Sequence, residues 1–253
     1  MKQAFLVAVA FLTRFPVTLP NGLTHRHQAQ SLMFYPMVGL LIGGLLWVIA
    51  AGMQDTAPLL ISAIVVGVWI LATGGLHLDG LADCADGWVG GIGDQSKTRQ
   101  IMKDPHVGAM AVVTLVMVLL MKVVALGEVL NHDGFAVLIV APALARCSSI
   151  ALFMTTSYVS ANGLGSNLVD QFGHEGGISG IKNGRRYALW GTALVAFVVL
   201  GWSALWLIAV LTAVFLYLRH LAVKRLGGFT GDVAGAMIEL IELAVCVTMA
   251  LLM

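Results

Sequence analysis

Acidic side chains gather in three short segments of this 253-residue chain. Seven of its thirteen Asp and Glu residues lie there, namely Asp79, Asp83, Asp86, Asp104, Asp232, Glu239 and Glu242. At about 100° per residue, the first three lie within an arc of about 60° on one face of a helix. The acids of the last segment likewise share one face of a helix with Gly235. Carboxylates on one face repel one another, so each group is favoured when a cation lies between its members.

Clustered carboxylate oxygens in a partly hydrated site suit Mg²⁺ or Mn²⁺, hard cations that also bind substrate phosphates. The direct hypothesis is a metal site for phosphate chemistry. For each acid taken alone, a buried ion pair or simple solvation is an alternative, but the chain has few neighbouring bases for salt bridges. Glycines surround both acidic regions, where they would expose backbone N–H groups to phosphate or let membrane helices pack closely.

Several bases and one histidine are candidates for contacts with a substrate. Lys103, Lys224 and Arg225 lie beside the acids, where they would bind phosphate oxygens or only anchor cytoplasmic loops. Arg146 stands in an otherwise uncharged stretch, so its expected partner is an acidic residue or a phosphate, unless it snorkels to a nearby interface. His77, close before the first acidic segment, is a base, a hydrogen-bond donor or a structural histidine.

The composition places these groups in a membrane protein. Hydrophobic residues make up 59% of the chain, charged residues make up 11%, and the mean hydropathy is +0.92. An ordinary soluble domain, in which about a quarter of the residues are charged, is thereby excluded. The net charge of +1 leaves no global electrostatic footprint for nucleic acid.

Long apolar stretches predict an all-α polytopic bundle of about seven transmembrane helices, each needing roughly 20 residues. The stretches are 27–54, 56–78, 105–121, 134–153, 187–218 and 233–253. The 187–218 stretch is long enough for a helical hairpin that turns near residues 201–203. Residues 5–12 are expected to form an amphipathic or partly inserted helix that is retained, because Arg14 follows and no cleavage site does. We expect one membrane-embedded domain over residues 1–253.

Basic residues occupy alternate loops, as in loops that stay in the cytoplasm. They are Lys97, Arg99 and Lys103, then Lys182, Arg185 and Arg186, then Arg219, Lys224 and Arg225. The opposite loops carry Asp55, Glu128 and Asp133 and no base. The pattern predicts that the three larger loops lie inside the cell and that the C-terminus lies outside.

Taken together, these residues closely resemble the motifs of the cobalamin synthase family, membrane enzymes also called adenosylcobinamide-GDP ribazoletransferases. The resemblance is carried by 73–87 (TGGLHLDGLADCADG), 101–104 (IMKD) with Gly108, 145–146 (AR), 163–165 (GLG) and 227–242 (GGFTGDVAGAMIELIE). Segments 11–16 (FLTRFP) and 34–39 (FYPMVG) extend it nearly end to end. The chain departs from the family motif at Pro105, His106 and Ala111, where Ser, Arg and Gly are expected. These departures affect the role expected of that loop and not the resemblance as a whole.

The resemblance implies the last assembly step of cobalamin synthesis, carried out in the bacterial inner membrane by an active site that faces the cytoplasm. Adenosylcobinamide-GDP receives α-ribazole or its 5′-phosphate, and GMP leaves. Mg²⁺, with Mn²⁺ as an alternative, would lie on the diphosphate, held by Asp79, Asp83, Asp86 and Asp232, with Asp104 and Glu239 as further candidates. Glu242, or otherwise Asp79 or His77, would accept the proton of the ribazole 5′-hydroxyl. The expected phosphate contacts are Lys103, Arg146 and Arg225, with Thr230 beside an acid or a phosphate.

Two other functions remain alternatives at this stage. A CDP-alcohol phosphotransferase would show D-x-x-D-G followed by A-R, and here only 83–87 matches. A divalent-cation or proton-coupled transporter would distribute its acids through the depth of the membrane, whereas four of the seven lie near the cytoplasmic ends. A homo-oligomer and an association with other cobalamin-assembly enzymes are also left open.

Overall fold

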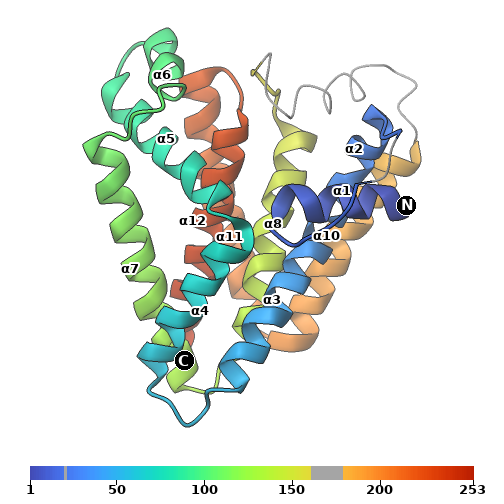
Figure 1. The fold of residues 1–253 in the computed structure, drawn as a ribbon, viewed down its shortest axis with the longest axis vertical. Helices are drawn as coiled ribbons and strands as arrows, with labels where there is room; N and C mark the ends of the chain where they lie inside the picture. The colour runs from blue at the N-terminus through green and yellow to red at the C-terminus, as the bar shows by residue number, and fades with distance from the viewer. Residues whose placement is uncertain (20–21, 161–178) are drawn as a thin grey trace.

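In the computed structural model, which describes residues 1–19, 22–160 and 179–253, the described chain is a bundle of α-helices without a named strand (Figure 1). The helices are α1 (Lys2–Leu12), α2 (His25–Ser31), α3 (Tyr35–Ala51), α4 (Pro58–Thr73), α5 (Leu76–Gly90), α6 (Gln95–Ile101), α7 (Ala109–Asn131), α8 (Ala136–Thr155), α10 (Ser179–Leu200), α11 (Ser203–Leu226) and α12 (Gly231–Leu252). A short 3₁₀ turn, Leu32–Phe34, joins α2 to α3. The all-α membrane architecture predicted from the sequence is confirmed.

Five helices of the described residues are long and apolar enough to cross a bilayer. They are His25–Ala51, which includes α2 and α3, and α7, α8, α11 and α12. The pair α4 and α5 makes a sixth span if it is counted as one. The predicted hairpin is confirmed, since α10 ends at Leu200, α11 begins at Ser203, and Gly201 between them has a φ of +60°. α10 is the remaining member of the predicted set of about seven and is not among these five or six.

The stretch predicted as one span over 56–78 is a broken helix instead. α4 and α5 meet at an angle of 91°. Gly74 and Gly75 form the break with φ values of +65° and +70°, a left-handed conformation that glycine adopts without steric cost. The backbone N–H of Arg14, just after α1, donates to the carbonyl of Ala72 at 2.8 Å, so the end of α1 is fixed beside the break. The break directs α5 toward the loop that leads to α6 (Figure 1).

Close helix packing builds the core around α8 and α12. A Cβ added at Gly39 of α3 would lie 2.5 Å from the carbonyl oxygen of Pro142 of α8, and one at Gly43 would lie 2.6 Å from the Cα of Ile139. Small residues therefore allow α3 and α8 to approach backbone to backbone, as in other membrane bundles. α12 packs against α5, α7, α8 and α11, which places its acidic face inside the bundle.

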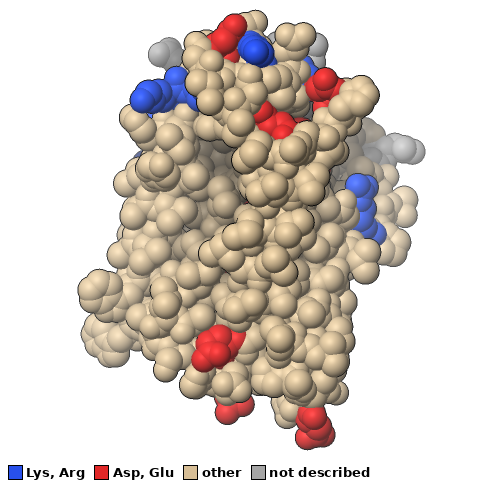
Figure 2. All heavy atoms as spheres, turned by 90° about the vertical axis from the view of Figure 1, so that its left-hand side faces the viewer, with Lys and Arg blue, Asp and Glu red and all other residues tan. Residues whose placement is uncertain are grey.

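The two ends of the bundle differ in charge. Figure 2 shows Lys and Arg in the upper part of the face it presents, together with acidic side chains, then an uncharged band, and acidic side chains without bases toward the lower end. The upper end corresponds to the end at which α6 lies in Figure 1, and the C-terminus lies at the opposite end. We call these the basic end and the acidic end. The uncharged band between them has the character of a surface that faces lipid.

Candidate active site

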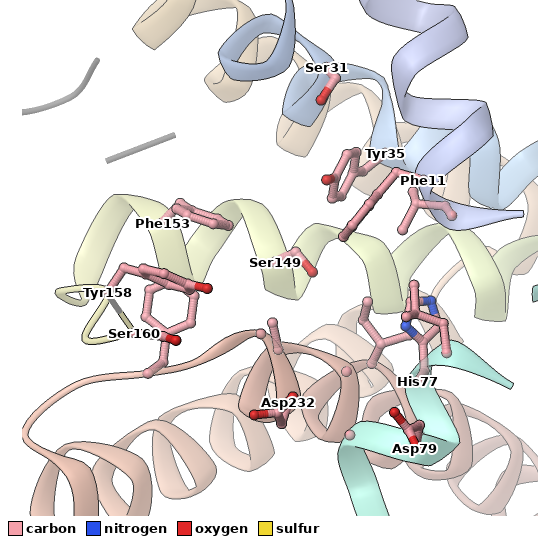
Figure 3. Close-up of a pocket in the computed structure, with 18 of the residues that line it drawn as sticks. Phe11, Ser31, Tyr35, His77, Asp79, Ser149, Phe153, Tyr158, Ser160 and Asp232 are labelled. Atoms are coloured by element: carbon pink, nitrogen blue, oxygen red, sulfur yellow. The ribbon is translucent and has the colours of Figure 1, made fainter. Parts of the chain in front are cut away.

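A cavity of about 300 Å³ lies between α1, α2 and α3 on one side and α5, α8 and α12 on the other. Figure 3 shows the two acids of its lining, Asp79 of α5 and Asp232 of α12, on the same side of the cavity. Lys and Arg are absent from the described residues that line it. The cavity therefore combines two carboxylates with a mainly apolar wall, and it is the place where two of the predicted acidic segments meet.

Glycines bring the two acidic helices together. A Cβ added at Gly80 would lie 2.7 Å from the carbonyl oxygen of Asp232, and one at Gly235 would lie 3.3 Å from the Cα of His77. α5 and α12 thus touch through their backbones at the level of the acids. The close approach allowed by Gly80 is between two helix backbones, which was one of the two predicted roles of the glycines around the acids.

Thr230 fixes the position of Asp232. It is the N-cap of α12, and its hydroxyl oxygen accepts from the backbone N–H of Val233 at 3.3 Å. The same hydroxyl donates to Oδ2 of Asp232 at 3.2 Å. A threonine at this position satisfies a free N–H of the first helical turn. The predicted contact of Thr230 with an acid is therefore present in the structure.

Asp83 belongs to the same acidic neighbourhood. Its carboxylate interacts electrostatically with those of Asp232, Asp79 and Asp86, and all three interactions between these like charges are repulsive in the absence of a cation. No salt bridge joins Asp79, Asp83 or Asp232 to a base among the described residues. Nor do the described residues bring three or more His, Cys, Asp or Glu side chains close enough to enclose a metal ion by themselves.

Asp86 stabilises the start of α7. Its Oδ2 accepts from the backbone N–H of Gly108 at 2.6 Å and its Oδ1 accepts from that of Ala111 at 2.9 Å. A Cβ at Gly108 would lie 2.5 Å from the same carboxylate, so the contact needs glycine. Both oxygens thus satisfy N–H groups at a helix N-terminus, where a negative charge is favoured. This cap was not predicted, because it joins residues more than twenty positions apart.

Asp104 and Lys103 lie in the exposed loop between α6 and α7. Oδ1 of Asp104 accepts from the backbone N–H of His106 at 3.0 Å and from its Nδ1 at 2.6 Å. These hydrogen bonds, the backbone one first, lower the pKa of the Asp104 carboxyl below its usual value. His106 is one of the positions where the chain departs from the family motif, and it forms a local turn with Asp104.

A second group of charges lies deeper in the bundle. Lys122 of α7 donates from Nζ to Oε2 of Glu239 at 3.0 Å and to Oε2 of Glu242 at 2.6 Å. Arg146 of α8 donates from Nη1 to Oε1 of Glu242 at 2.9 Å. All four side chains are buried, and Nζ of Lys122 also lies 4.2 Å from the ring centroid of Trp69. We call Lys122, Arg146, Glu239 and Glu242 the buried charge cluster.

The buried charge cluster engages two residues predicted for chemistry. Glu239 was a candidate metal ligand and Glu242 a candidate proton acceptor, yet both accept from Lys122 and neither lines the cavity. Arg146 has the acidic partner that was one of its two predicted partners. Lys122 was missed by the sequence analysis. Its signal was the same as that of Arg146, a single base inside an apolar helix.

His77 connects the cavity with the buried charge cluster. It lines the cavity, and its side chain interacts electrostatically with Arg146 and Lys122. Its Nε2 is buried and has no hydrogen-bond partner among the described residues. Of the three predicted proton acceptors, His77 and Asp79 therefore lie at the cavity, and Glu242 lies beneath it.

Arg225 ties the end of α11 to the neighbouring helices. Its Nε donates to Oγ1 of Thr98 at 2.9 Å, and its Nη2 donates to the carbonyl of Trp88 at 3.0 Å. Arg99 forms a matching contact, donating from Nη2 to the carbonyl of Leu226 at 2.6 Å. The guanidinium of Arg225, which the sequence predicted to contact phosphate, joins α11 to α5 and α6 in the structure. The 163–165 segment of the family motif lies outside the described residues.

Comparisons with known proteins agree with the motifs. The family model described as cobalamin-5-phosphate synthase matches residues 4–250. A protein of Pseudomonas fluorescens (strain Pf0-1) named adenosylcobinamide-GDP ribazoletransferase is 44% identical over 97% of this chain and 98% of its own length. Two further proteins of the same name are similar to the same degree. The one from Pseudomonas entomophila (strain L48) is 44% identical over 98% of each chain, and the one from Stutzerimonas stutzeri (strain A1501) is 43% identical over 97% of each chain. No solved structure matches the chain.

Proposed function

This chain belongs to the cobalamin-5-phosphate synthase family, and we propose that it acts as an adenosylcobinamide-GDP ribazoletransferase. The observation that carries the proposal is the match over residues 4–250, which includes both acidic helices of the cavity. In the reaction, the 5′-hydroxyl oxygen of α-ribazole bonds to the phosphorus next to the corrinoid. The P–O bond to GMP breaks, and the hydroxyl proton passes to a base on the enzyme.

The acidic neighbourhood at the cavity fits a divalent cation. Asp79, Asp83 and Asp232 supply only oxygen donors, which Mg²⁺ prefers, and no salt bridge within the described residues neutralises them. Mg²⁺ is commonly held by one or two carboxylates together with water and substrate phosphates, so it does not need three protein ligands. We assign Asp83 and Asp232 to the metal. When bound, Mg²⁺, or Mn²⁺ in its place, would neutralise the diphosphate and stabilise the leaving phosphate.

The residues of the chain itself divide the remaining tasks. Asp79 is exposed to the cavity and is our candidate for accepting the 5′-hydroxyl proton. Thr230 holds Asp232 in place through its hydrogen bond. Lys103 is exposed at the basic end, where a diphosphate would approach, and is our candidate for binding its oxygens. The four-membered buried charge cluster lies beneath and holds α7, α8 and α12 together.

The basic end is proposed to face the cytoplasm of a bacterial inner membrane. Its loops carry Lys97, Arg99 and Lys103, while the loops of the acidic end carry no Lys or Arg. A cysteine introduced at Lys97 should react with an impermeant thiol reagent only after the cells are opened, whereas a cysteine at Asp133 should react in intact cells. The three native cysteines are first replaced, and the reverse result would overturn the orientation.

Reconstituted protein tests the activity directly. Proteoliposomes receive adenosylcobinamide-GDP, α-ribazole and Mg²⁺, and the release of GMP is measured together with the flux of a divalent cation across the vesicles. GMP release that depends on both substrates supports the transferase. Cation flux without GMP would instead support the transporter alternative. Replacing α-ribazole with its 5′-phosphate identifies the acceptor, and omission of Mg²⁺ or its exchange for Mn²⁺ tests the cofactor.

A further inference from the structure

Three aromatic rings form one wall of the active-site cavity. The ring centroids of Phe153 and Tyr158 lie 6.0 Å apart in a stacked arrangement, and Phe229 meets them edge to face at 4.9 Å and 5.2 Å. All three residues line the cavity. Figure 3 shows Phe153 and Tyr158 at the same end of the cavity, with Asp232 on the helix beneath. We call Phe153, Tyr158 and Phe229 the aromatic wall.

The backbone fixes the aromatic wall relative to Asp232. α8 ends at Thr155, and the following segment pairs with the segment before α12 through the bridge between Tyr158 and Phe229. The N–H of Phe229 donates to the carbonyl of Ser157 at 3.0 Å, and the N–H of Val159 donates to the carbonyl of Phe229 at 2.9 Å. Phe229 stands three residues before Asp232. The end of α8, which carries Phe153, and the start of α12, which carries Asp232, are therefore held together by hydrogen bonds between the segments of Tyr158 and Phe229.

Charge and size restrict what this cavity can hold. Its described lining has no Lys or Arg, and away from the carboxylates of Asp79 and Asp232 it is mainly apolar, so that part of the cavity favours an uncharged group over a phosphate. Its volume of about 300 Å³ is at the lower end of the range for small-molecule sites. A nucleoside fits such a volume, while a corrin ring with its side chains does not. Aromatic rings beside it offer a stacking surface for a flat base.

On the basis of the transferase function proposed above, we propose that this cavity is the subsite for the uncharged acceptor nucleoside. Its flat heteroaromatic base lies against Phe153 and Tyr158, and its ribose 5′-hydroxyl points toward Asp79 and Asp232. The bulky corrinoid then stays outside the cavity, and the anionic diphosphate reaches the carboxylate side of the cavity from the basic end. This arrangement accounts for an apolar aromatic wall and a pair of carboxylates in one small space.

Substitutions in the aromatic wall separate the two substrates. Phe153→Leu and Tyr158→Leu should each raise the KM for α-ribazole about 10-fold, an ordinary effect of losing one stacking ring, and leave the KM for adenosylcobinamide-GDP within about twofold. Tyr158→Phe keeps the ring and should raise the KM for α-ribazole less than Tyr158→Leu does. Phe197→Leu is the matched control, since Phe197 pairs with Trp202 at the turn between α10 and α11. It should change neither KM.

Other outcomes would overturn the assignment. A rise in the KM for the GDP-activated substrate alone would place guanine against the aromatic wall, and unchanged KM values for both substrates would remove the wall from binding. If the leucine variants do not fold, binding of α-ribazole to the intact wild-type protein is measured without the donor, with guanosine as competitor. Binding that guanosine does not displace supports the subsite, and equal displacement or no binding contradicts it. A wild-type protein that binds α-ribazole but releases no GMP would refute the transferase and leave the subsite standing.

Discussion

Lys122 of α7 donates a 2.6 Å hydrogen bond to Glu242 of α12, and both side chains are buried inside the bundle. Arg146 donates to the other oxygen of Glu242, and Glu239 accepts from Lys122. Two bases therefore face two acids, so the cluster is neutral when all four groups are ionised. A buried group of charges is tolerated when it is paired and hydrogen-bonded in this way.

Removal of Lys122 alone should destabilise the protein more than removal of Lys122 together with its partner Glu239. Lys122→Met leaves an excess negative charge in the bundle, which is expected to cost about 3–5 kcal/mol. Lys122→Met combined with Glu239→Gln leaves Arg146 and Glu242 as a neutral pair, so the double variant should be the more stable of the two. Thermal unfolding in detergent measures both.

Lys97→Met serves as the control for Lys122→Met, because Lys97 is exposed. It should leave the unfolding temperature within the error of the measurement, as surface substitutions usually do. Equal unfolding temperatures for the single and double variants would contradict the expectation that removal of Glu239 relieves an excess negative charge.

Gly80 should be required for activity because of its contact with α12. Gly80→Ala places a Cβ 2.7 Å from the carbonyl oxygen of Asp232, so α5 and α12 must separate and Asp79 moves away from Asp232. A displacement of this kind is expected to reduce kcat/KM by about 100-fold. Gly67→Ala is the control, since a Cβ there meets nothing within 4 Å, and it should retain activity. Full activity of Gly80→Ala would show that the close approach is not needed.

The sequence predicted the features that depend on local pattern. The helical hairpin around Gly201 follows from the length of one uncharged stretch, and the shared face of Asp79, Asp83 and Asp86 follows from helical spacing. Residues 76–90 do form the helix that this spacing assumed, despite the glycines within it.

Features that depend on contacts between distant segments could not be predicted in the same way. The cap that Asp86 provides for α7 exists only because the loop through α6 returns the chain to α5. Likewise, the hydropathy of residues 56–78 is that of a continuous span, and the 91° break arises from two consecutive glycines in the left-handed conformation. Lys122 carried a visible signal, but its two acidic partners lie on a helix more than one hundred residues away.

Asp83 and Asp86 should differ in their dependence on Mg²⁺. Asp83→Asn removes a carboxylate that we assign to the metal, so the Mg²⁺ concentration for half-maximal activity should rise about 10-fold or more. Asp86→Asn removes a charge that caps α7, so it should mainly lower stability, by about 1 kcal/mol. Mg²⁺ titrations of GMP release and thermal unfolding distinguish the two effects. The same Mg²⁺ requirement in both variants would contradict the division of roles.

Asp79 and Glu242 should likewise separate chemistry from stability. Asp79 lines the cavity and is exposed, whereas Glu242 is fully buried and its oxygens accept from Lys122 and Arg146. Asp79→Asn keeps the size of the side chain but cannot accept the hydroxyl proton, so kcat should fall by about 10²–10⁴-fold with little change in unfolding temperature. Glu242→Gln leaves an excess positive charge in the bundle and should lower the unfolding temperature markedly. A Glu242→Gln variant that is stable but inactive, beside an active Asp79→Asn variant, would return the role of proton acceptor to Glu242.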